Sequence, residues 1–447
     1  MIQTRHPQNL NAVHAAFLKN LSISKLNAMQ EAVITKAAEA NDVMLVAPTG
    51  TGKTLAFLIA VYNKLRIDDK GLQAIIVAPS RELALQIEQV FKNMKTLYKV
   101  TCCYGGHSMK LEQDSLRNSP AVLIATPGRL ADHIDRDSID VSSAKVVVLD
   151  EFDKSLQMGF HDQLKMLFNA LNGKQQHILT SATHNDTLPG FLPFRTPEVL
   201  NFIPDTEDTQ KLQISVVRTK SSDKAEALMR LVAGFNQEVC LVFCNQRDAV
   251  ERISAVFKYH KFEHGIFHGA LEQIDREKNL IRFRGGAHNV LLATDLAARG
   301  LDIPEIRHIV HYQLPPREEE FIHRNGRTAR MHAHGKSYLL LADDESLPSY
   351  LDKTLPEVSL SKSLKLPPPP QYVCLYVSAG KKDKVSKGDI AGLFMKKAEL
   401  SGDEIGLIVI LDYASYVSVK RSVLPKVLRA LKEEKLKKIK VKIEVAN

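Results

Sequence analysis

The first stretch whose residues could do chemistry is APTGTGKT, residues 47–54, which directly follows a short apolar run. It is a P-loop with alanine in place of the first glycine. Its glycines let backbone N–H groups approach a phosphate at the start of a helix. We expect Lys53 to reach the β- and γ-phosphates and Thr54 to hold Mg²⁺, so the motif predicts nucleotide binding. The residues assigned to this site are Ala47, Thr49, Gly50, Thr51, Gly52, Lys53 and Thr54.

A group of carboxylates follows a second apolar run. VVVL, residues 146–149, leads directly into Asp150, Glu151 and Asp153. Burying carboxylates beside a strand is costly unless a cation pairs with them. An acidic turn at a strand end is one interpretation. The presence of a P-loop favours the other, in which Asp150 holds Mg²⁺ as a Walker B carboxylate and Glu151 orients and deprotonates the attacking water.

Three arginines recur at a spacing of three in HRNGRTAR, residues 323–330. In isolation, Arg324, Arg327 and Arg330 would indicate a basic helix face. In a two-domain nucleotide hydrolase, arginines of the second domain can instead close over the γ-phosphate. An arginine finger of this kind can be worth ~10³–10⁵ in rate, and it makes hydrolysis depend on domain closure.

Apolar strand patterns alternate with helical patterns along the first 345 residues. Nearly continuous apolar strands of this kind are typical of parallel sheets covered on both faces. The pattern occurs twice, which predicts two doubly wound α/β domains. The expected strands lie at 43–48, 74–79, 121–127, 146–150 and 177–183, and then at 239–245, 290–295, 308–314 and 337–342.

The remaining residues follow a different order. PPPP at 367–370 predicts a stiff spacer of roughly 12 Å. Beyond it the pattern is β-α-β-β-α-β, the split βαβ arrangement that RNA-recognition domains also use. Its expected strands lie at 372–378, 405–412, 415–421 and 438–445, and its expected helices at 388–397 and 423–435.

Composition narrows the class of protein. The 447 residues are 44% hydrophobic and 25% charged, as in ordinary soluble proteins. No apolar run reaches membrane-spanning length, and the first residues lack the apolar stretch of a signal peptide. Five cysteines without a CxxC pair indicate a reducing cytoplasm, and the histidines show no zinc spacing.

Positive charge is concentrated in the last part of the chain. The net charge is +9, and residues 371–447 carry sixteen Lys and Arg against nine Asp and Glu. A small basic domain on a nearly neutral body suggests a polyanion partner such as nucleic acid. A solvated lysine-rich surface is the alternative.

Taken together, the motifs resemble those of the DEAD-box RNA helicases over residues 20–345. Besides the motifs above, the chain has PSRELA (79–84), GG (105–106), TPGR (126–129), SAT (181–183), VFCN (242–245), HGALEQIDR (268–276) and ATDLAARGLD (293–302). The resemblance implies an ATP- and Mg²⁺-dependent enzyme that clamps single-stranded RNA across two RecA-like domains.

The resemblance also implies residue roles. Gln30 would read adenine, Asp295 would meet the ribose or phosphates, and Arg327 and Arg330 would reach the γ-phosphate. Asp153, Ser181, Thr183 and His323 would couple the nucleotide site to the domain interface. Arg81, Gly106, Thr126, Arg129, Arg276 and Thr294 would grip the RNA backbone.

The chain departs from the family pattern near two of these sites. In SISKLNAMQ, residues 22–30, Leu26 and Asn27 replace the usual proline and threonine or serine before Gln30. DEFD has Phe152 where the family has alanine. Because alanine does no chemistry there, we expect Phe152 to be a packing variation.

The tail resembles the RNA-binding domain of DbpA-type DEAD-box proteins, through AGKKDK (379–384), GDIAG (388–392), IGLIVI (405–410) and SYVSVKR (415–421). This implies anchoring to a hairpin of large-subunit ribosomal RNA during ribosome assembly. Tyr376 lies where an RNA-recognition strand presents an aromatic. The aromatic pattern is incomplete, so we expect RNA to bind the lysine-rich turn, with Lys381, Lys382 and Lys384.

The predicted fold is α/β, with two tandem RecA-like doubly wound domains and a small α+β RRM-like domain. The expected boundaries are 1–205, 206–365, a proline-rich linker at 366–370, and 371–447. We expect a cytoplasmic, monomeric RNA-stimulated ATPase that unwinds duplexes locally and acts on pre-ribosomal particles, with no membrane partner. The alternatives are an ATP-gated RNA clamp and a general RNA chaperone without ribosomal targeting.

Overall fold

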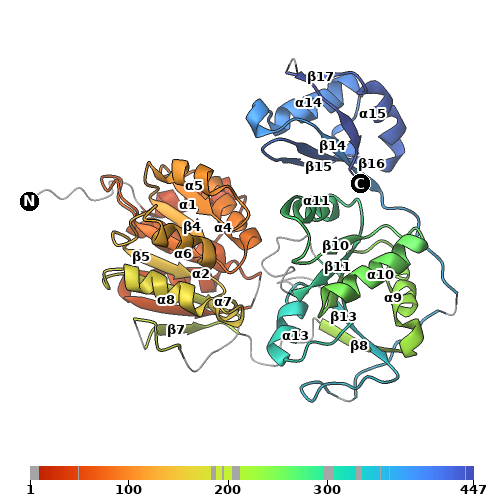
Figure 1. Ribbon diagram of the computed structural model, residues 1–447, viewed down its shortest axis with the longest axis horizontal. Coiled ribbons are helices and arrows are strands. Elements are labelled where there is room, and N and C mark those ends of the chain that lie inside the picture. The colour runs from red at the N-terminus through yellow and green to blue at the C-terminus, as the bar shows by residue number, and fades with distance from the viewer. Residues whose placement is uncertain are drawn as a thin grey trace, which may run out of the picture. The chain divides into compact units, whose positions relative to one another are not determined.

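The computed structural model describes residues 10–48, 50–182, 188–193, 196–203, 212–295, 306–328, 335–352, 354–361, 363–437 and 439–446. These residues form two compact units, one up to residue 203 and one from residue 212 (Figure 1). The sequence boundaries at 205 and 365 stay predictions. Within the described part of the chain, no helix is long and apolar enough to cross a bilayer.

The first unit is a wholly parallel seven-stranded sheet in the order β3-β4-β2-β5-β6-β1-β7. Its strands are β1 (Asp42–Val46), β2 (Ala74–Val77), β3 (Val100–Cys103), β4 (Val122–Ala125), β5 (Val146–Leu149), β6 (Gln176–Ser181) and β7 (Glu198–Asn201). Its helices are α1 (Leu10–Asn20), α2 (Ala28–Glu39), α3 (Lys53–Lys64), α4 (Arg81–Asn93), α5 (Met109–Leu116), α6 (Pro127–Asp135), α7 (Phe152–Gln157) and α8 (His161–Ala170).

Alternate residues of the same strand enter two different cores. On β2, Ile76 packs among the side chains of α3 and α4, while Ile75 and Val77 pack with Leu130 of α6 and Leu164 of α8. A sheet buried on both faces explains why its strands read as continuous apolar runs. The carboxyl ends of these parallel strands meet at one edge, where ligand-binding loops lie in open α/β sheets.

The second unit begins with another wholly parallel sheet, in the order β10-β11-β9-β12-β13-β8. Its strands are β8 (Leu212–Thr219), β9 (Cys240–Cys244), β10 (Gly265–Phe267), β11 (Val290–Thr294), β12 (His308–His311) and β13 (Gly335–Ala342). Its helices are η2 (Ser221–Asp223), α9 (Lys224–Ala233), α10 (Arg247–Tyr259), α11 (Gln273–Arg284) and α13 (Glu318–Asn325). The two parallel sheets confirm the predicted fold class.

A small α+β domain completes the second unit, with an antiparallel sheet in the order β15-β16-β14-β19. Its strands are β14 (Tyr372–Val377), β15 (Ile405–Ile410), β16 (Ser415–Lys420), β17 (Lys435–Leu436), β18 (Ile439–Lys440) and β19 (Ile443–Val445). Its helices are η3 (Lys381–Asp383), α14 (Lys387–Lys397), η4 (Gly402–Glu404), η5 (Arg421–Val423) and α15 (Leu424–Ala430).

Two expected elements of this domain are shorter than predicted. The helix expected over 423–435 ends at Ala430, and the strand expected over 438–445 is reduced to β19. Residues 435–436 and 439–440 instead form the β17–β18 pair, and Lys437, which follows β17, has a φ of 46°. A non-glycine residue in this left-handed region marks a turn rather than a strand.

The open face of the small sheet is covered by its own neighbour in the second unit. Leu375 and Val377 of β14 enter the core of the small domain. Cys374 and Tyr416, with Tyr376 at the margin, pack instead against Ile281 and Ala287 at the end of α11. The tyrosines therefore serve as packing groups here, and RNA binding by the lysine-rich turn stays a prediction.

The proline segment lies against the second parallel domain. The Gln237 amide donates to the Pro368 carbonyl at 3.0 Å, and the Arg421 Nε donates to the Pro370 carbonyl at 2.8 Å. Arg421 also pairs with Glu263 at 2.8 Å. The segment predicted as a stiff spacer is thus held by hydrogen bonds at Pro368 and Pro370.

Candidate functional site

The P-loop joins the end of β1 to the first turn of α3. Gly50 and Gly52 have φ values of 83° and 88°, in the region that glycine adopts without strain. Lys53 begins α3 and is only 7% exposed, and its ammonium donates to the Ala47 carbonyl at 2.5 Å. Thr51 closes the turn by donating to the Pro48 carbonyl. Thr54 is the second residue of α3, and Thr49 lies outside the described residues.

The segment before α2 is tied directly to this loop. Asn27 caps α2 by accepting the Gln30 N–H, and the Gln30 side chain accepts the Asn27 N–H in return. Asn27 also donates to the Thr51 carbonyl at 3.0 Å, and Gln30 donates to the Gly52 carbonyl at 3.2 Å. Asn27 departs from the family pattern, but it caps α2 and contacts the P-loop. Asparagine is a preferred residue at helix N-caps, so the capping role could have been predicted from the sequence.

Asp150 lies at the end of β5, two strands from β1 across the sheet. Its carboxylate accepts the Thr180 hydroxyl at 2.5 Å and the Glu151 N–H at 3.2 Å. Burial, and then the neighbouring charge of Glu151, raise the pKa of Asp150 to about 6, although Thr180 and Lys53 oppose this. A buried carboxylate with a raised pKa is suited to a cation, which would favour its ionised form.

Glu151 follows in a strained conformation. Its φ is 46°, it is 8% exposed, and its N–H is held by the Thr180 hydroxyl at 3.0 Å. Left-handed backbone at a glutamate costs about 1–3 kcal/mol and is typical of functional sites. The strain turns the chain sharply from β5 into α7. Phe152, the first residue of α7, is 1% exposed and packs in the core with Leu149 and Leu164.

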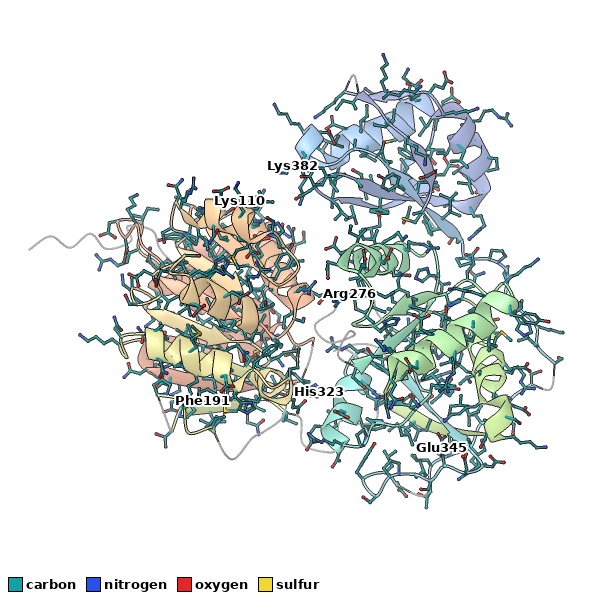
Figure 2. The ribbon with its side chains drawn as sticks, viewed as in Figure 1. Lys110, Phe191, Arg276, His323, Glu345 and Lys382 are labelled. Carbon is teal, nitrogen blue, oxygen red and sulfur yellow. The ribbon has the colours of Figure 1, made fainter. Side chains whose placement is uncertain are left out.

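The residues expected to couple the two domains lie in different units. Asp153 and Ser181 are buried in the first unit, on α7 and at the end of β6. His323 is buried on α13 of the second unit, and Figure 2 labels it there. Thr183 lies outside the described residues.

The expected RNA contacts of the first unit gather at the carboxyl ends of β2, β3 and β4. Arg81 begins α4, and Thr126 immediately precedes α6, on which Arg129 lies. Gly106 has a φ of 88°, and a methyl group there would lie 2.6 Å from the Arg81 guanidinium. The backbone conformation at this position therefore favours glycine, and any side chain there would displace the end of Arg81.

The second unit holds Asp295 through an arginine. Arg324 on α13 donates to the two Asp295 carboxylate oxygens at 2.6 and 2.5 Å, and to the Asn245 side chain at 2.7 Å. The Arg324 side chain is 1% exposed. The spacing of the arginines singled out Arg324 in the sequence, but it could not show that Arg324 pairs with Asp295, 29 positions away. Arg327 is buried beyond it, and Arg330 lies outside the described residues.

The remaining expected RNA contacts are in the same unit. Arg276 on α11, labelled in Figure 2, lies over the Phe267 ring at 5.3 Å, and Thr294 ends β11. In the small domain, exposed Lys381, Lys382 and Lys384 form the η3 turn. The Lys381 and Lys382 N–H groups donate to the carbonyls of residues 411 and 412 at 2.8 and 2.9 Å, which fixes the turn.

Comparison with known proteins identifies three families along the chain. Residues 27–189 match the DEAD/DEAH box helicase family, 223–332 the helicase conserved C-terminal domain, and 374–445 the DbpA RNA binding domain.

Two of the similar proteins align with this chain over almost its whole length. The chain is 29% identical to the ATP-dependent RNA helicase DbpA of Bacillus subtilis (strain 168), with 96% of each chain covered. It has the same identity and coverage with DbpA of Escherichia coli (strain K12). Among solved structures, S. cerevisiae Dbp5 bound to RNA and ADP BeF3 matches with a TM-score of 0.67 and 26% identity, covering 75% of this chain and 90% of that one. The chain therefore belongs to the DEAD-box ATP-dependent RNA helicases and carries a DbpA-type RNA-binding domain.

Proposed function

We propose that the chain uses ATP hydrolysis to unwind RNA duplexes locally on large-subunit ribosomal RNA during ribosome assembly. The observation that carries this targeting is the match of residues 374–445 to the DbpA RNA binding domain. We further propose that it acts as a cytoplasmic monomer on pre-ribosomal particles. The helicase part supplies an engine without sequence preference, because phosphate and sugar contacts carry little sequence information.

Hydrolysis requires Mg²⁺, which neutralises charge on the phosphates when it is bound. Thr54 and Asp150 would hold it, and the raised pKa of Asp150 supports this role because a cation would favour the ionised carboxylate. Lys53 would approach the phosphates from the first turn of α3. Glu151 would orient the attacking water and accept its proton.

In this proposal, the second domain would supply the remaining groups of the site on closure. Arg327 and Arg330 would stabilise charge at the γ-phosphate, and Asp295, held by Arg324, would meet the ribose or phosphates. Asp153, Ser181, Thr183 and His323 would transmit closure between the domains. RNA would be gripped by Arg81, Gly106, Thr126, Arg129, Arg276 and Thr294.

The catalytic assignment is tested with Glu151→Gln, which keeps the size of the side chain but not its basicity. RNA-stimulated ATP turnover of the full chain is expected to fall by roughly 10²–10⁴. ATP binding, measured by displacement of a fluorescent nucleotide, is expected to stay close to wild type. Unchanged turnover would contradict the role of Glu151.

Targeting is tested by replacing Lys381, Lys382 and Lys384 together with Gln. A matched control replaces Lys396, Lys432 and Lys435, which are exposed on the same domain, so both variants lose the same charge. Binding to a fragment of large-subunit ribosomal RNA and to a generic duplex is measured at two salt concentrations, because each lost phosphate contact lowers the salt slope by about 1. We expect only the first variant to lose preference for the ribosomal fragment. Equal losses on both RNAs would contradict targeting.

A further inference from the structure

One buried carboxylate in the first unit has no role in the ATP site. Glu112 lies on α5, and its side chain is 1% exposed. Acidic side chains are almost never fully buried unless they are paired. We therefore expect specific partners around Glu112 that compensate for its burial. The residue lies beside the loops that are expected to hold RNA.

Both Glu112 oxygens are engaged. Oε1 accepts the Tyr104 N–H at 3.1 Å and lies 3.1 Å from His107 Nδ1. Oε2 accepts from Arg129 Nη1 at 3.2 Å and lies 2.9 Å from His133 Nε2. Tyr104 and His107 flank the two glycines of the GG motif. Arg129 and His133 lie on α6, whose first turn contains the end of the TPGR motif (the TPGR turn).

Arg129 completes the connection from the other side. Its side chain is 10% exposed, and its second terminal nitrogen donates to the His107 carbonyl at 3.0 Å. The guanidinium thus binds both the carboxylate and the loop that the carboxylate holds. Because charge-assisted hydrogen bonds of this kind are strong and directional, they fix the two loops relative to each other.

The shifts in pKa agree with a structural role for this ion-paired cluster. Burial opposes ionisation of Glu112, but His133, the Tyr104 N–H and Arg129 together lower its pKa. Cys103 lies in the same cluster, and its sulfur is within 4.8 Å of the ligand atoms of Glu112 and His133. Burial, and then Glu112, raise the pKa of the Cys103 thiol to about 12, so it stays protonated. The guanidinium of Arg129, which is paired with the same carboxylate, disfavours a metal ion there by charge repulsion.

We propose that Glu112 is a positioning residue for RNA binding, joining the GG loop and the TPGR turn into one rigid edge. The proposal rests on the proposed function. It also implies that Arg129 supports RNA binding by holding this edge together. An RNA strand then meets backbone groups of Gly106 and Thr126 that are already in place. Preorganisation lowers the cost of ordering these loops on binding.

The test uses the full chain and measures ATP turnover against RNA concentration. Glu112→Ala is expected to raise the RNA concentration for half-maximal stimulation roughly 10- to 100-fold, the scale expected for misplaced binding groups. The ATP KM and the turnover at saturating RNA should change little. Glu112→Gln retains an acceptor for Arg129 and should recover most of the RNA affinity. Asp114→Ala, on the exposed side of the same helix, is the matched control and should match wild type.

If Glu112→Ala does not fold, the double variant Glu112→Leu, Arg129→Met removes both charges of the buried pair, an exchange that proteins often tolerate. Its RNA half-saturation should be as weak as in Arg129→Met alone, because the two residues act as one unit. Wild-type RNA half-saturation in Glu112→Ala or in the double variant would overturn the proposal. A bound transition metal that is lost in Glu112→Gln, found by elemental analysis, would also overturn it. Failure of the proposed function is distinguishable, since wild type itself would then show no stimulation by RNA.

Discussion

Replacing Asp150 with Asn is predicted to stabilise the nucleotide-free protein while it ends hydrolysis. The pKa of Asp150 is raised from 3.8 to about 6 in the folded protein. Each pKa unit is worth about 1.4 kcal/mol, so the ionised carboxylate destabilises the fold by about 3 kcal/mol at neutral pH. Asn cannot ionise, and its side-chain oxygen can still accept the Thr180 hydroxyl.

The sign of the pH dependence follows from proton binding. Because the folded pKa lies above the unfolded one, the folded protein binds more protons between about pH 4 and pH 6, and its stability falls as the pH rises through this window. The advantage of Asp150→Asn should therefore be complete above about pH 6 and absent below about pH 4.

Thermal unfolding without Mg²⁺ or nucleotide measures this difference. At pH 7.5 the variant should unfold roughly 6–12 °C above wild type, and near pH 4 the two should coincide. Asp140→Asn is the control, because hydrogen bonds from Ser142 lower the pKa of that exposed carboxyl. It should bring no stabilisation at neutral pH. A destabilised Asp150→Asn at pH 7.5, or an equal shift at both pH values, would refute the reasoning.

Three other substitutions test the remaining structure. Arg324→Met leaves the carboxylate of Asp295 without its cationic partner and should lower the free energy of unfolding, measured by urea titration, by about 3–5 kcal/mol. The control Arg218→Met breaks an exposed ion pair and should lower it by less than about 1 kcal/mol. Phe152→Ala should cost about 3–5 kcal/mol through a cavity, yet retain ATP turnover at low temperature, and an inactive folded variant would contradict its packing role. Gly52→Ala should raise the ATP KM, because the φ of Gly52 is 88° and a methyl group there would lie 2.5 Å from Nε2 of Gln30. An unchanged ATP KM would count against this geometry.

The sequence predicted the residues whose chemistry is local. Lys53 and Asp150 follow short apolar runs, and their motifs specify strand ends without knowledge of any distant partner. Asn27, Glu112 and Arg324 act through contacts between segments that are remote in sequence. Asn27 contacts the P-loop, Glu112 contacts α6, and Arg324 contacts Asp295, which follows β11. Such pairings appear only once the sheet order has brought the segments together.

Periodicity was reliable for the inner parallel strands, but it missed the strands at the sheet edges, β3, β7, β8 and β10, and it was less accurate near the C-terminus. Strands buried on both faces leave a continuous apolar signature, as on β2 and β9. The last strand of the small domain is short and partly exposed, so its alternation did not reveal the turn at Lys437. The covered sheet face was also invisible, because a tyrosine that packs and a tyrosine that stacks on a base look alike in sequence.

The contact between that sheet face and α11 decides how the chain can be divided. A protein ending before residue 371 would expose Ile281 and Ala287 to water, and the released fragment would expose Tyr416 and Cys374. Exposed apolar patches promote association, so both pieces are expected to aggregate at concentrations that the intact protein tolerates. The second parallel domain and the small domain are therefore expected to be expressed together. Point substitutions in the lysine turn would test its proposed RNA binding without exposing this apolar contact, whereas truncation would change both.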